Sequence, residues 1–209
     1  MVVPSDSSIK PPSTESSDLI GEGVIIDIGT GDGRFVYQSA RRKPNKFYIG
    51  IDPNTRPLEK ISEKIHRKTA KGGAPNVLFI QSAIEDLPAE LDGVANEVHV
   101  HFPWGSLLRA VATADVDVLR NLRRICAVDG LLEVVIGIDP VRDKTEIERL
   151  GIKPEFVDDV LVENYRAAGF EIIETGLSSQ TLDTSWAKRL QRRVTFIVAR
   201  ADRITGFAE

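Results

Sequence analysis

Hydrophobic and polar residues follow two different patterns along this chain, and together they predict its secondary structure. Short apolar runs bounded by glycine or polar residues predict seven strands, at residues 23–28, 46–52, 76–81, 96–102, 130–138, 170–177 and 192–200. Between these runs, apolar residues recur at the spacing of a helix face, which predicts helices over residues 33–43, 55–69, 115–126 and 157–168. Strands that alternate with helices indicate an α/β fold, a mostly parallel sheet with helices on both faces.

The first part of the chain lacks this alternation. Residues 1–22 are rich in Ser, Pro and Thr and contain few apolar residues, so they are predicted to form a disordered tail. The chain has 209 residues and is 42% hydrophobic, which suits one compact domain with a sizeable core. The predicted organisation is therefore a tail over residues 1–22 and a single domain over residues 23–209.

Composition argues against several classes of protein. No apolar run approaches the roughly 20 residues of a membrane-spanning helix, and no signal-peptide pattern opens the chain, so a cytoplasmic protein without a membrane partner is expected. Cys126 is the only cysteine, which rules out an internal disulfide, and its apolar neighbours predict a packed helix residue. His66, His99 and His101 lack other metal ligands at a familiar spacing, so no metal site is expected. The absence of a strongly apolar exposed stripe favours a monomer.

Charge is unevenly distributed along the chain. The formal net charge is −4, yet residues 41–71 hold ten Lys and Arg against three Asp and Glu. Residues 185–200 hold five Lys and Arg and no acidic residue. Two basic stretches on an acidic protein fit a nucleic-acid-binding face with the acidic remainder turned away. The alternative is that these side chains merely solvate helix surfaces, and charge alone does not decide between the two.

The strongest candidate for chemistry is the run from Val24 to Gly33, Val-Ile-Ile-Asp-Ile-Gly-Thr-Gly-Asp-Gly. An apolar strand reaches Asp27, and three glycines at alternate positions follow, which is typical of a buried strand that turns tightly into a helix. Glycine lets the backbone approach a ligand closely, and a helix N-terminus offers unpaired N–H groups. The next strand ends at Asp52, where an acidic residue is placed to hold ribose hydroxyls. The two strand ends predict a nucleoside-cofactor site at the carboxyl edge of the sheet.

The same turn indicates which cofactor is bound. Dinucleotide-binding folds place a pyrophosphate on the helix N-terminus after a G-x-G-x-x-G turn, but here Asp32 would repel it. A carboxylate in the turn suits a ligand that carries positive charge, such as the amino group of S-adenosylmethionine. The alternative is an ordinary strand–turn–helix unit in which Asp27 and Asp52 are solvated strand ends.

Two tryptophans are candidates for holding a substrate. Trp104 lies in the loop after the fourth predicted strand and Trp186 just before the last one, so both return to the carboxyl edge of the sheet. Bases stack on aromatic faces for about 1–3 kcal/mol each, and two such rings could clamp a flipped purine. The alternative is that each tryptophan is a packing residue of the core or its rim.

These motifs resemble those of known enzymes. The run from Val24 to Gly33 resembles motif I of the class I S-adenosylmethionine-dependent methyltransferases, and Gly50-Ile-Asp resembles their ribose-binding loop. The resemblance implies their Rossmann-like fold, a seven-stranded, mostly parallel sheet whose last strand is reversed. More narrowly, the chain looks like the kanamycin–apramycin resistance methyltransferases at Phe-Pro-Trp-Gly-Ser-Leu-Leu (102–108), Ser-Trp-Ala-Lys-Arg-Leu (185–190) and Lys-Gly-Gly (71–73).

That narrower resemblance implies methylation of N1 of a decoding-site adenine, adenine 1408 in helix 44 of 16S rRNA, which blocks aminoglycoside binding and gives antibiotic resistance. The implied partner is the small ribosomal subunit. Trp104 and Trp186 are implied to hold the flipped adenine, with Thr184 near the methyl-transfer centre. The implied cofactor contacts are Asp27, Gly29, Thr30, Gly31, Phe35, Asp52, Pro53, Ala83, Ile84, Glu85, His101, Phe102, Pro103, Trp104, Gly105, Ser106, Thr184, Ser185 and Trp186. The residues implied to grip rRNA phosphates are Lys64, Arg67, Lys68, Lys71, Lys188 and Arg189.

The expected mechanism requires no general base. Adenine N1 carries an in-plane lone pair, so it needs no deprotonation before methyl transfer, and catalysis rests on positioning. Three other functions stay open at this point. They are a tRNA guanine-N7 methyltransferase, whose corresponding loop also holds Phe-Pro and Trp, a small-molecule methyltransferase, and a non-catalytic module that binds the cofactor or the ribosome.

Overall fold

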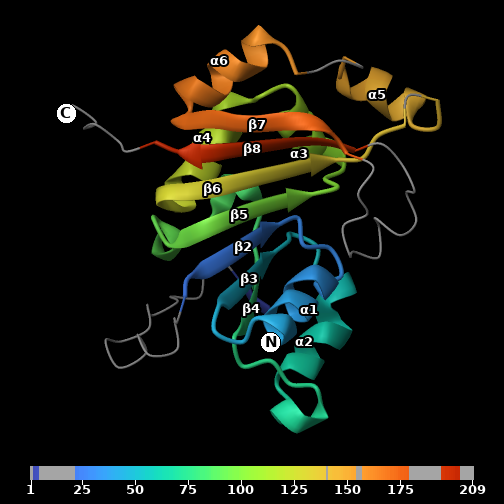
Figure 1. Cartoon of the computed structure of the whole chain (residues 1–209). Coiled ribbons are helices and arrows are strands. Elements are labelled where there is room, and N and C mark those ends of the chain that lie inside the picture. Colours follow the sequence, from blue (N-terminus) through green and yellow to red (C-terminus); the bar gives the residue numbers. More distant parts are fainter. Residues whose placement is uncertain (1, 5–21, 140, 154–156, 179–193, 203–209) are drawn as a thin grey trace.

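The structure, a computed structural model, describes residues 2–4, 22–139, 141–153, 157–178 and 194–202. The strands of these residues form one sheet in the order β1-β4-β3-β2-β5-β6-β8-β7 (Figure 1). The strands are β1 (Val2–Pro4), β2 (Val24–Ile28), β3 (Phe47–Ile51), β4 (Val77–Gln81), β5 (Ala95–His101), β6 (Cys126–Ile136), β7 (Phe170–Ser178) and β8 (Val194–Ala201). The helices are α1 (Arg34–Arg42), α2 (Glu59–Ile65), α3 (Gly105–Ala112), α4 (Val116–Ile125), α5 (Lys144–Leu150) and α6 (Asp159–Ala167).

The direction of the strands agrees with the expected sheet. β8 runs antiparallel to both β6 and β7, whereas every other neighbouring pair in the described sheet is parallel. The prediction of a mostly parallel sheet with a reversed last strand is confirmed. No helix among the described residues is long and apolar enough to cross a membrane.

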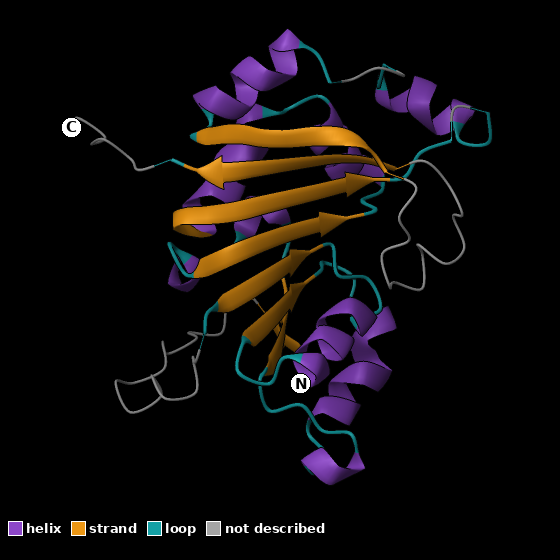
Figure 2. Ribbon diagram, viewed as in Figure 1, coloured by secondary structure: helices purple, strands orange, loops and turns teal. Residues whose placement is uncertain are grey.

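Helices pack on both faces of the sheet, as predicted (Figure 2). α1 and α2 lie on one face, over the half of the sheet that contains β3 and β4, and α3 and α4 lie on the opposite face, behind the half that contains β6 and β8. α6 packs against β7 and α4. On the first face, Val36 of α1 packs with Phe79 of β4. On the second, Leu119 of α4 belongs to the same core as Leu132 of β6. Burial of these two apolar layers is the main force that holds the sheet between its helices.

Three elements were not predicted from the sequence. β1 pairs with β4 through Val2–Pro4, inside the segment expected to be a disordered tail, so that expectation is wrong for these three residues. Residues 5–21 lie outside the described residues. The sequence also did not predict α3 and α5. Pro103 and Gly105 resemble loop residues at the start of α3, and α5 is short and largely charged.

Cys126 is buried as expected, but it is not a helix residue. It is 2% exposed and begins β6 directly after α4 ends. Burial raises the pKa of its thiol to about 12, so the thiol stays protonated and acts as a small core side chain. The helix predicted over residues 115–126 therefore ends one residue earlier, and the strand predicted from residue 130 begins at Cys126.

Phe79 fills the space beneath the turn that follows β2. Its ring is fully buried, and a Cβ added to Gly33 or Gly50 would lie 2.7 Å from it. The replacement Phe79→Ala would leave a cavity there, so it is expected to lower the free energy of unfolding by about 3–5 kcal/mol. Urea denaturation measures this change. The control Val141→Ala, at a position that is 84% exposed, is expected to change stability by less than about 0.5 kcal/mol. An equally small effect of Phe79→Ala would contradict this packing.

Candidate active site

A cavity of about 480 Å³ lies at the carboxyl ends of β2, β3 and β5. β2 lies between β3 and β5, so the chain reverses its progress through the sheet here, and open α/β sheets bind ligands at such a point. The predicted cofactor residues that line the cavity are Asp27, Gly29, Thr30, Gly31, Phe35, Asp52, Pro53, His101, Phe102, Pro103, Trp104 and Ser106. The structure thus brings together residues from three strand ends that are distant in the sequence.

The glycine turn places the backbone directly against the end of β3. Gly31 has a φ of +58°, a left-handed conformation that glycine adopts without strain. Its amide donates a hydrogen bond to Oδ2 of Asp52 at 2.9 Å, and the amide of Asn54 donates one to Oδ1 at 2.8 Å. Both carboxylate oxygens are fixed in this way, and each retains lone pairs that can accept from ribose hydroxyls.

Asp27 supplies a buried carboxylate to the same cavity. Its side chain lies at the carboxyl end of β2 and the residue is 4% exposed. Burial raises the pKa of the Asp27 carboxyl, whereas the nearby His101 and His99 act in the opposite direction. A cationic group of a bound ligand would favour the ionised carboxylate further. Asp32, the turn carboxylate predicted to favour a cationic ligand, lines the same cavity.

The loop from β5 to α3 forms the outer wall of the cavity. The amide of Phe102 donates a hydrogen bond to the carbonyl of Val135 at 2.7 Å, which ties the loop to β6. Phe102 has a φ of +50°, so the chain turns sharply there. Trp104 follows at the N-terminus of α3 and is 55% exposed. A ring this exposed on the rim of a cavity is available to stack on a substrate.

Some predicted cofactor residues are not among those that line the cavity: Ala83, Ile84, Glu85 and Gly105. Ile84 instead packs in the larger core. Conversely, three lining residues were not named as candidates in the sequence, Arg34, Pro57 and Leu107, whereas Asp32, predicted to favour a cationic ligand, also lines the cavity. Arg34 directly follows the glycine motif, which was the available signal for it. Pro57 lies in the short helix Arg56–Leu58, at the start of the helix predicted over residues 55–69, and Leu107 lies in α3, which was not predicted.

Five predicted site residues lie outside the described residues: Thr184, Ser185, Trp186, Lys188 and Arg189. Their roles remain predictions.

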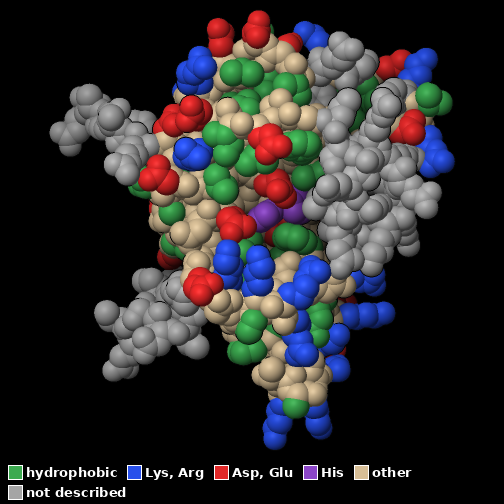
Figure 3. Space-filling model, viewed as in Figure 1, with side chains coloured by type: hydrophobic (Ala, Val, Ile, Leu, Met, Phe, Trp, Pro, Cys, Tyr) green, Lys and Arg blue, Asp and Glu red, His purple; other side chains and the backbone are tan. Residues whose placement is uncertain are grey.

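The other predicted RNA-binding residues lie together in and after α2: Lys64, Arg67, Lys68 and Lys71. The last three are exposed, and the Lys64 ammonium lies 4.4 Å from the ring centroid of Tyr37. The guanidinium of Arg41 donates hydrogen bonds to the carbonyls of Thr69 and Gly73 at 2.9 and 3.1 Å. α1 therefore holds this basic segment, residues 64–71, in a fixed shape. Figure 3 shows Lys and Arg side chains gathered over the end of the molecule that contains α1 and α2.

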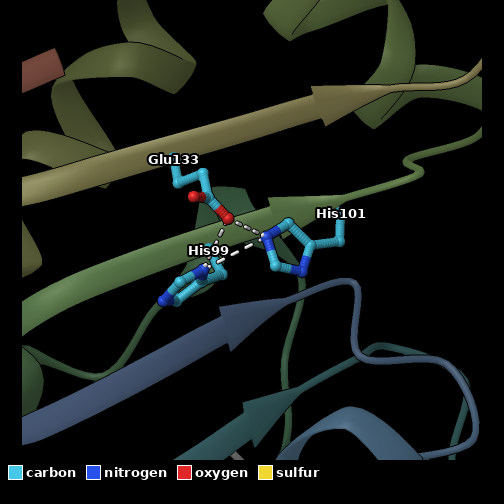
Figure 4. A group of neighbouring side chains, drawn as sticks. All are labelled: His99, His101 and Glu133. Carbon is cyan, nitrogen blue, oxygen red and sulfur yellow. Dashed lines mark hydrogen bonds and ion pairs between the residues drawn. The ribbon is translucent and has the colours of Figure 1, made fainter. Parts of the chain in front are cut away.

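Two of the histidines have neighbours that were not predicted from the sequence. His99 and His101 lie on one face of β5, and Glu133 lies beside them on β6 (Figure 4). Oε1 of Glu133 is 2.6 Å from Nε2 of His101 and 3.2 Å from Nδ1 of His99, and the two nitrogens are 3.1 Å apart. The expectation that these histidines lack metal-ligand neighbours is therefore wrong. Strand periodicity places residues 99 and 101 on one face, and strand pairing adds Glu133.

Further charges extend this cluster along the sheet. Oε2 of Glu97 lies 3.3 Å from Nε2 of His99, and Oε1 of Glu97 lies 2.8 Å from Nζ of Lys46. Burial opposes the charged form of His99, but hydrogen bonds to Glu133 and Glu97 raise its pKa to about 9. The hydrogen bond from His99, assisted by Lys46, lowers the pKa of Glu97 to about 2. Hydrogen bonds from His101 and His99 lower the pKa of Glu133. The cluster is thus a set of ion pairs beside the cavity.

The fold and the cavity define the class of the protein. A mostly parallel sheet with a reversed last strand, a glycine turn after β2 and an acidic residue after β3 characterise a class I S-adenosylmethionine-dependent methyltransferase. Asp52, the residue predicted to hold the ribose, and Asp27 both line this cavity. A model of one family, described as NpmA: 16S rRNA (adenine(1408)-N(1))-methyltransferase, matches residues 14–202. The chain belongs to this family, and S-adenosylmethionine is its methyl donor.

Individual relatives agree with this assignment. A 16S rRNA (adenine(1408)-N(1))-methyltransferase of Escherichia coli is 37% identical over 186 residues, which are 84% of this chain and 85% of the relative. The aminoglycoside resistance methyltransferase NpmB1, known from a crystal structure, is 48% identical in sequence to this chain. The two structures superpose with a TM-score of 0.80, and the match covers 90% of this chain and 91% of that one. A mutant 16S rRNA (adenine(1408)-N(1))-methyltransferase from Catenulisporales acidiphilia, solved with cosubstrate SAM, is 33% identical. Its TM-score is 0.85 over 96% of this chain and 95% of that one.

The position of Asp52 leads to a prediction about cofactor affinity. The replacement Asp52→Ala removes two oriented oxygens, so it is expected to raise the Kd for S-adenosylmethionine by about 10- to 100-fold, the worth of one or two hydrogen bonds to a charged group. Isothermal titration calorimetry measures the Kd, with circular dichroism to check that the variant is folded. Asp117→Ala, on the exposed surface of α4, serves as the matched control and should bind normally. Wild-type affinity in Asp52→Ala would contradict the ribose assignment.

Proposed function

We propose that this chain methylates N1 of adenine 1408 of 16S rRNA in the small ribosomal subunit, with Trp104 and Trp186 holding the flipped base. The observation that carries the proposal is the position of Trp104, a 55% exposed tryptophan on the rim of the cofactor cavity. A flipped base needs such a stacking face because it has left the stacking of its own helix. Membership of the family supplies the identity of the target base.

The residues of the cavity are suited to positioning. When bound, S-adenosylmethionine supplies a methyl group on a sulfonium centre, which adenine N1 can accept through its lone pair without losing a proton. Asp52 is held by the amides of Gly31 and Asn54, and Nε2 of His101 is engaged by Glu133. These side chains therefore act as fixed parts of the site. Trp104 contributes a flat apolar face, which also stabilises the positive charge that the adenine gains on methylation.

The basic segment supports a structured RNA as the substrate. Arg67, Lys68 and Lys71 are exposed on the same side of the sheet as α1, and the hydrogen bonds from Arg41 fix the segment that carries them. A fixed array of cations matches the fixed spacing of phosphates in a folded RNA better than a flexible chain would. We infer that this segment docks on rRNA while Trp104 reaches the target base. We also infer that the protein acts as a monomer and in the cytoplasm.

Methylation at this position explains antibiotic resistance. A methyl group on N1 adds bulk and a positive charge to the base-pairing edge of the adenine. Aminoglycosides are themselves cationic, so the modified adenine opposes them through both contact and charge.

Methyl transfer to purified ribosomal subunits tests the proposal. The protein is incubated with radiolabelled S-adenosylmethionine and intact small subunits, and arrest of reverse transcription maps the modified base. Arrest at adenine 1408 is the expected result, with large subunits and total tRNA as unmodified controls. Label in tRNA would instead support a guanine-N7 enzyme. Normal cofactor binding without label in either RNA would overturn an RNA substrate.

Replacement of Trp104 tests the stacking role. Loss of one base–aromatic contact is worth about 1–3 kcal/mol, so Trp104→Ala is expected to lower kcat/KM for the small subunit by roughly 5- to 150-fold. The Kd for S-adenosylmethionine should change by less than about threefold, the effect of one lost exposed contact. Trp104→Phe keeps a stacking face and should restore most of the activity. Trp186→Ala is expected to behave as Trp104→Ala does. Wild-type turnover in either alanine variant would refute the clamp.

Charge reversal tests the basic segment. The double replacement Arg67→Glu and Lys68→Glu removes two candidate phosphate contacts, so it is expected to weaken binding to small subunits and to reduce the salt slope of log K by about 1–2. Filter binding at several salt concentrations measures both quantities. Lys144→Glu on α5 reverses a charge outside this segment and serves as the control. An unaltered salt slope in the double variant would assign these side chains to a merely solvated surface.

A further inference from the structure

The side chains of His99, His101 and Glu133 form a cluster beside the cofactor cavity, and of the three only His101 lines that cavity. We infer that Nδ1 of His99, Nε2 of His101 and Oε1 of Glu133 bind a divalent transition-metal ion of the zinc type. The inference is separate from the proposed function, since it concerns a cluster on the face of the sheet and an ion that the methyl-transfer chemistry does not require.

Three donor atoms of this cluster point at one place. The three ligand atoms are 3.1, 3.2 and 2.6 Å from one another, and Figure 4 shows them directed toward each other from two strands. Zinc binds nitrogen and oxygen at about 2.0–2.2 Å, which separates tetrahedral ligands by roughly 3.3–3.5 Å. Two edges of the triangle are already close to this value. Rotation of the Glu133 side chain, which is 35% exposed, would open the third.

Hydrogen bonds can link the two nitrogens to Glu133 but cannot also link the nitrogens to each other. A contact is a hydrogen bond only where a proton points along it. Two histidine nitrogens and one carboxylate oxygen provide at most two such protons, and both would then point to Oε1 of Glu133. The two N–H groups then lie side by side, with their nitrogens 3.1 Å apart and no hydrogen bond between them. A cation at the centre satisfies all three donor atoms together.

The residues around the cluster also resemble the surroundings of a metal site. A histidine that binds a metal usually donates its other ring N–H to a carboxylate, which fixes the ring and strengthens the ligand. Nε2 of His99 faces Oε2 of Glu97 at 3.3 Å, and Lys46 holds Glu97 in place at 2.8 Å. The ring of Phe35 packs against both histidine rings, at centroid distances of 5.4 and 4.8 Å. The cluster thus has an oriented ligand, an outer carboxylate and an apolar wall.

Charge and access are also favourable. His99 is paired with Asp27 on β2 and with Glu133 on β6, so a cation bound at His99 would lie near two carboxylates. Figure 3 shows histidine side chains at the surface over β5, next to acidic side chains. Water can therefore supply a fourth ligand, as in zinc sites that have three protein ligands. A bound ion would join β5 to β6 and fix His101, which lines the cofactor cavity.

Zinc titration of untagged protein tests the inference. The protein is first stripped with EDTA and dialysed, and ZnCl₂ is then added in a calorimeter without cofactor or RNA. One ion is expected per chain, together with a rise in Tm, because an ion that binds only the folded chain stabilises it. The variants His99→Asn and Glu133→Gln are each expected to weaken binding at least tenfold and to lose the rise in Tm. His66→Ala, which alters the histidine outside the cluster, is the matched control and should bind zinc normally.

Spectroscopy keeps the test decisive if a variant does not fold. X-ray absorption at the zinc edge of the wild-type protein is expected to show two imidazole ligands, and Co²⁺ in place of zinc should give the visible bands of a four- or five-coordinate nitrogen–oxygen site. Absence of saturable zinc binding to the wild type would overturn the inference. Zinc binding that persists unchanged in His99→Asn and Glu133→Gln, or a spectrum without imidazole ligands, would also overturn it. The methyl-transfer assay is not involved, so its failure and the failure of this inference are distinguishable.

Discussion

The active site depends on how closely the turn after β2 approaches the end of β3. The amides of Gly29 and Thr30 both donate to the carbonyl of Ile51, at 2.8 and 3.1 Å, and the amide of Gly31 donates to the Asp52 carboxylate. These bonds set the distance between the glycine turn and Asp52, the residue predicted to hold the ribose. Beneath them, Phe79 occupies the volume that a side chain at residue 33 or residue 50 would need. The third glycine of the motif is therefore required for packing, whereas the first two line the cavity.

The sequence predicted the fold well where burial alone determines structure. β2 is buried at every residue and β3 at all but the first, so their apolar runs are plain in the sequence. α3 was missed because its first turn contains Gly105 and follows Pro103, residues that usually indicate a loop. The start of β6 was misplaced because Cys126 leaves the helix at ψ 134° without a glycine or proline to mark the change. β1 consists of three residues and exists through its pairing with β4, which local sequence cannot show.

The same distinction applies to the site. Asp27 and Asp52 were predicted because the ends of parallel strands meet at one edge whatever the register of the strands. The histidine cluster was missed because it requires that register. The alternation of Glu97, His99 and His101 in β5 was enough to place them on one face, but the sequence did not show that Glu133 pairs with His99 across β5 and β6. The cavity wall contributed by Leu107 also depends on a helix that the sequence did not predict.

β5 marks a change in the character of one face of the sheet. On the β3 and β4 side, this face is apolar and packs against α1, through side chains such as Tyr48 and Phe79. On β5 it becomes polar, and Phe35 of α1 packs against both histidine rings at this boundary. A charged row in such a place is stable only when each charge has a partner, because an unpaired buried charge costs several kcal/mol. The pairs from Lys46 through Glu97 and His99 to Glu133 meet that condition. Of the histidine cluster only His101 lines the cavity, so Glu97, His99 and Glu133 are left for interactions outside it.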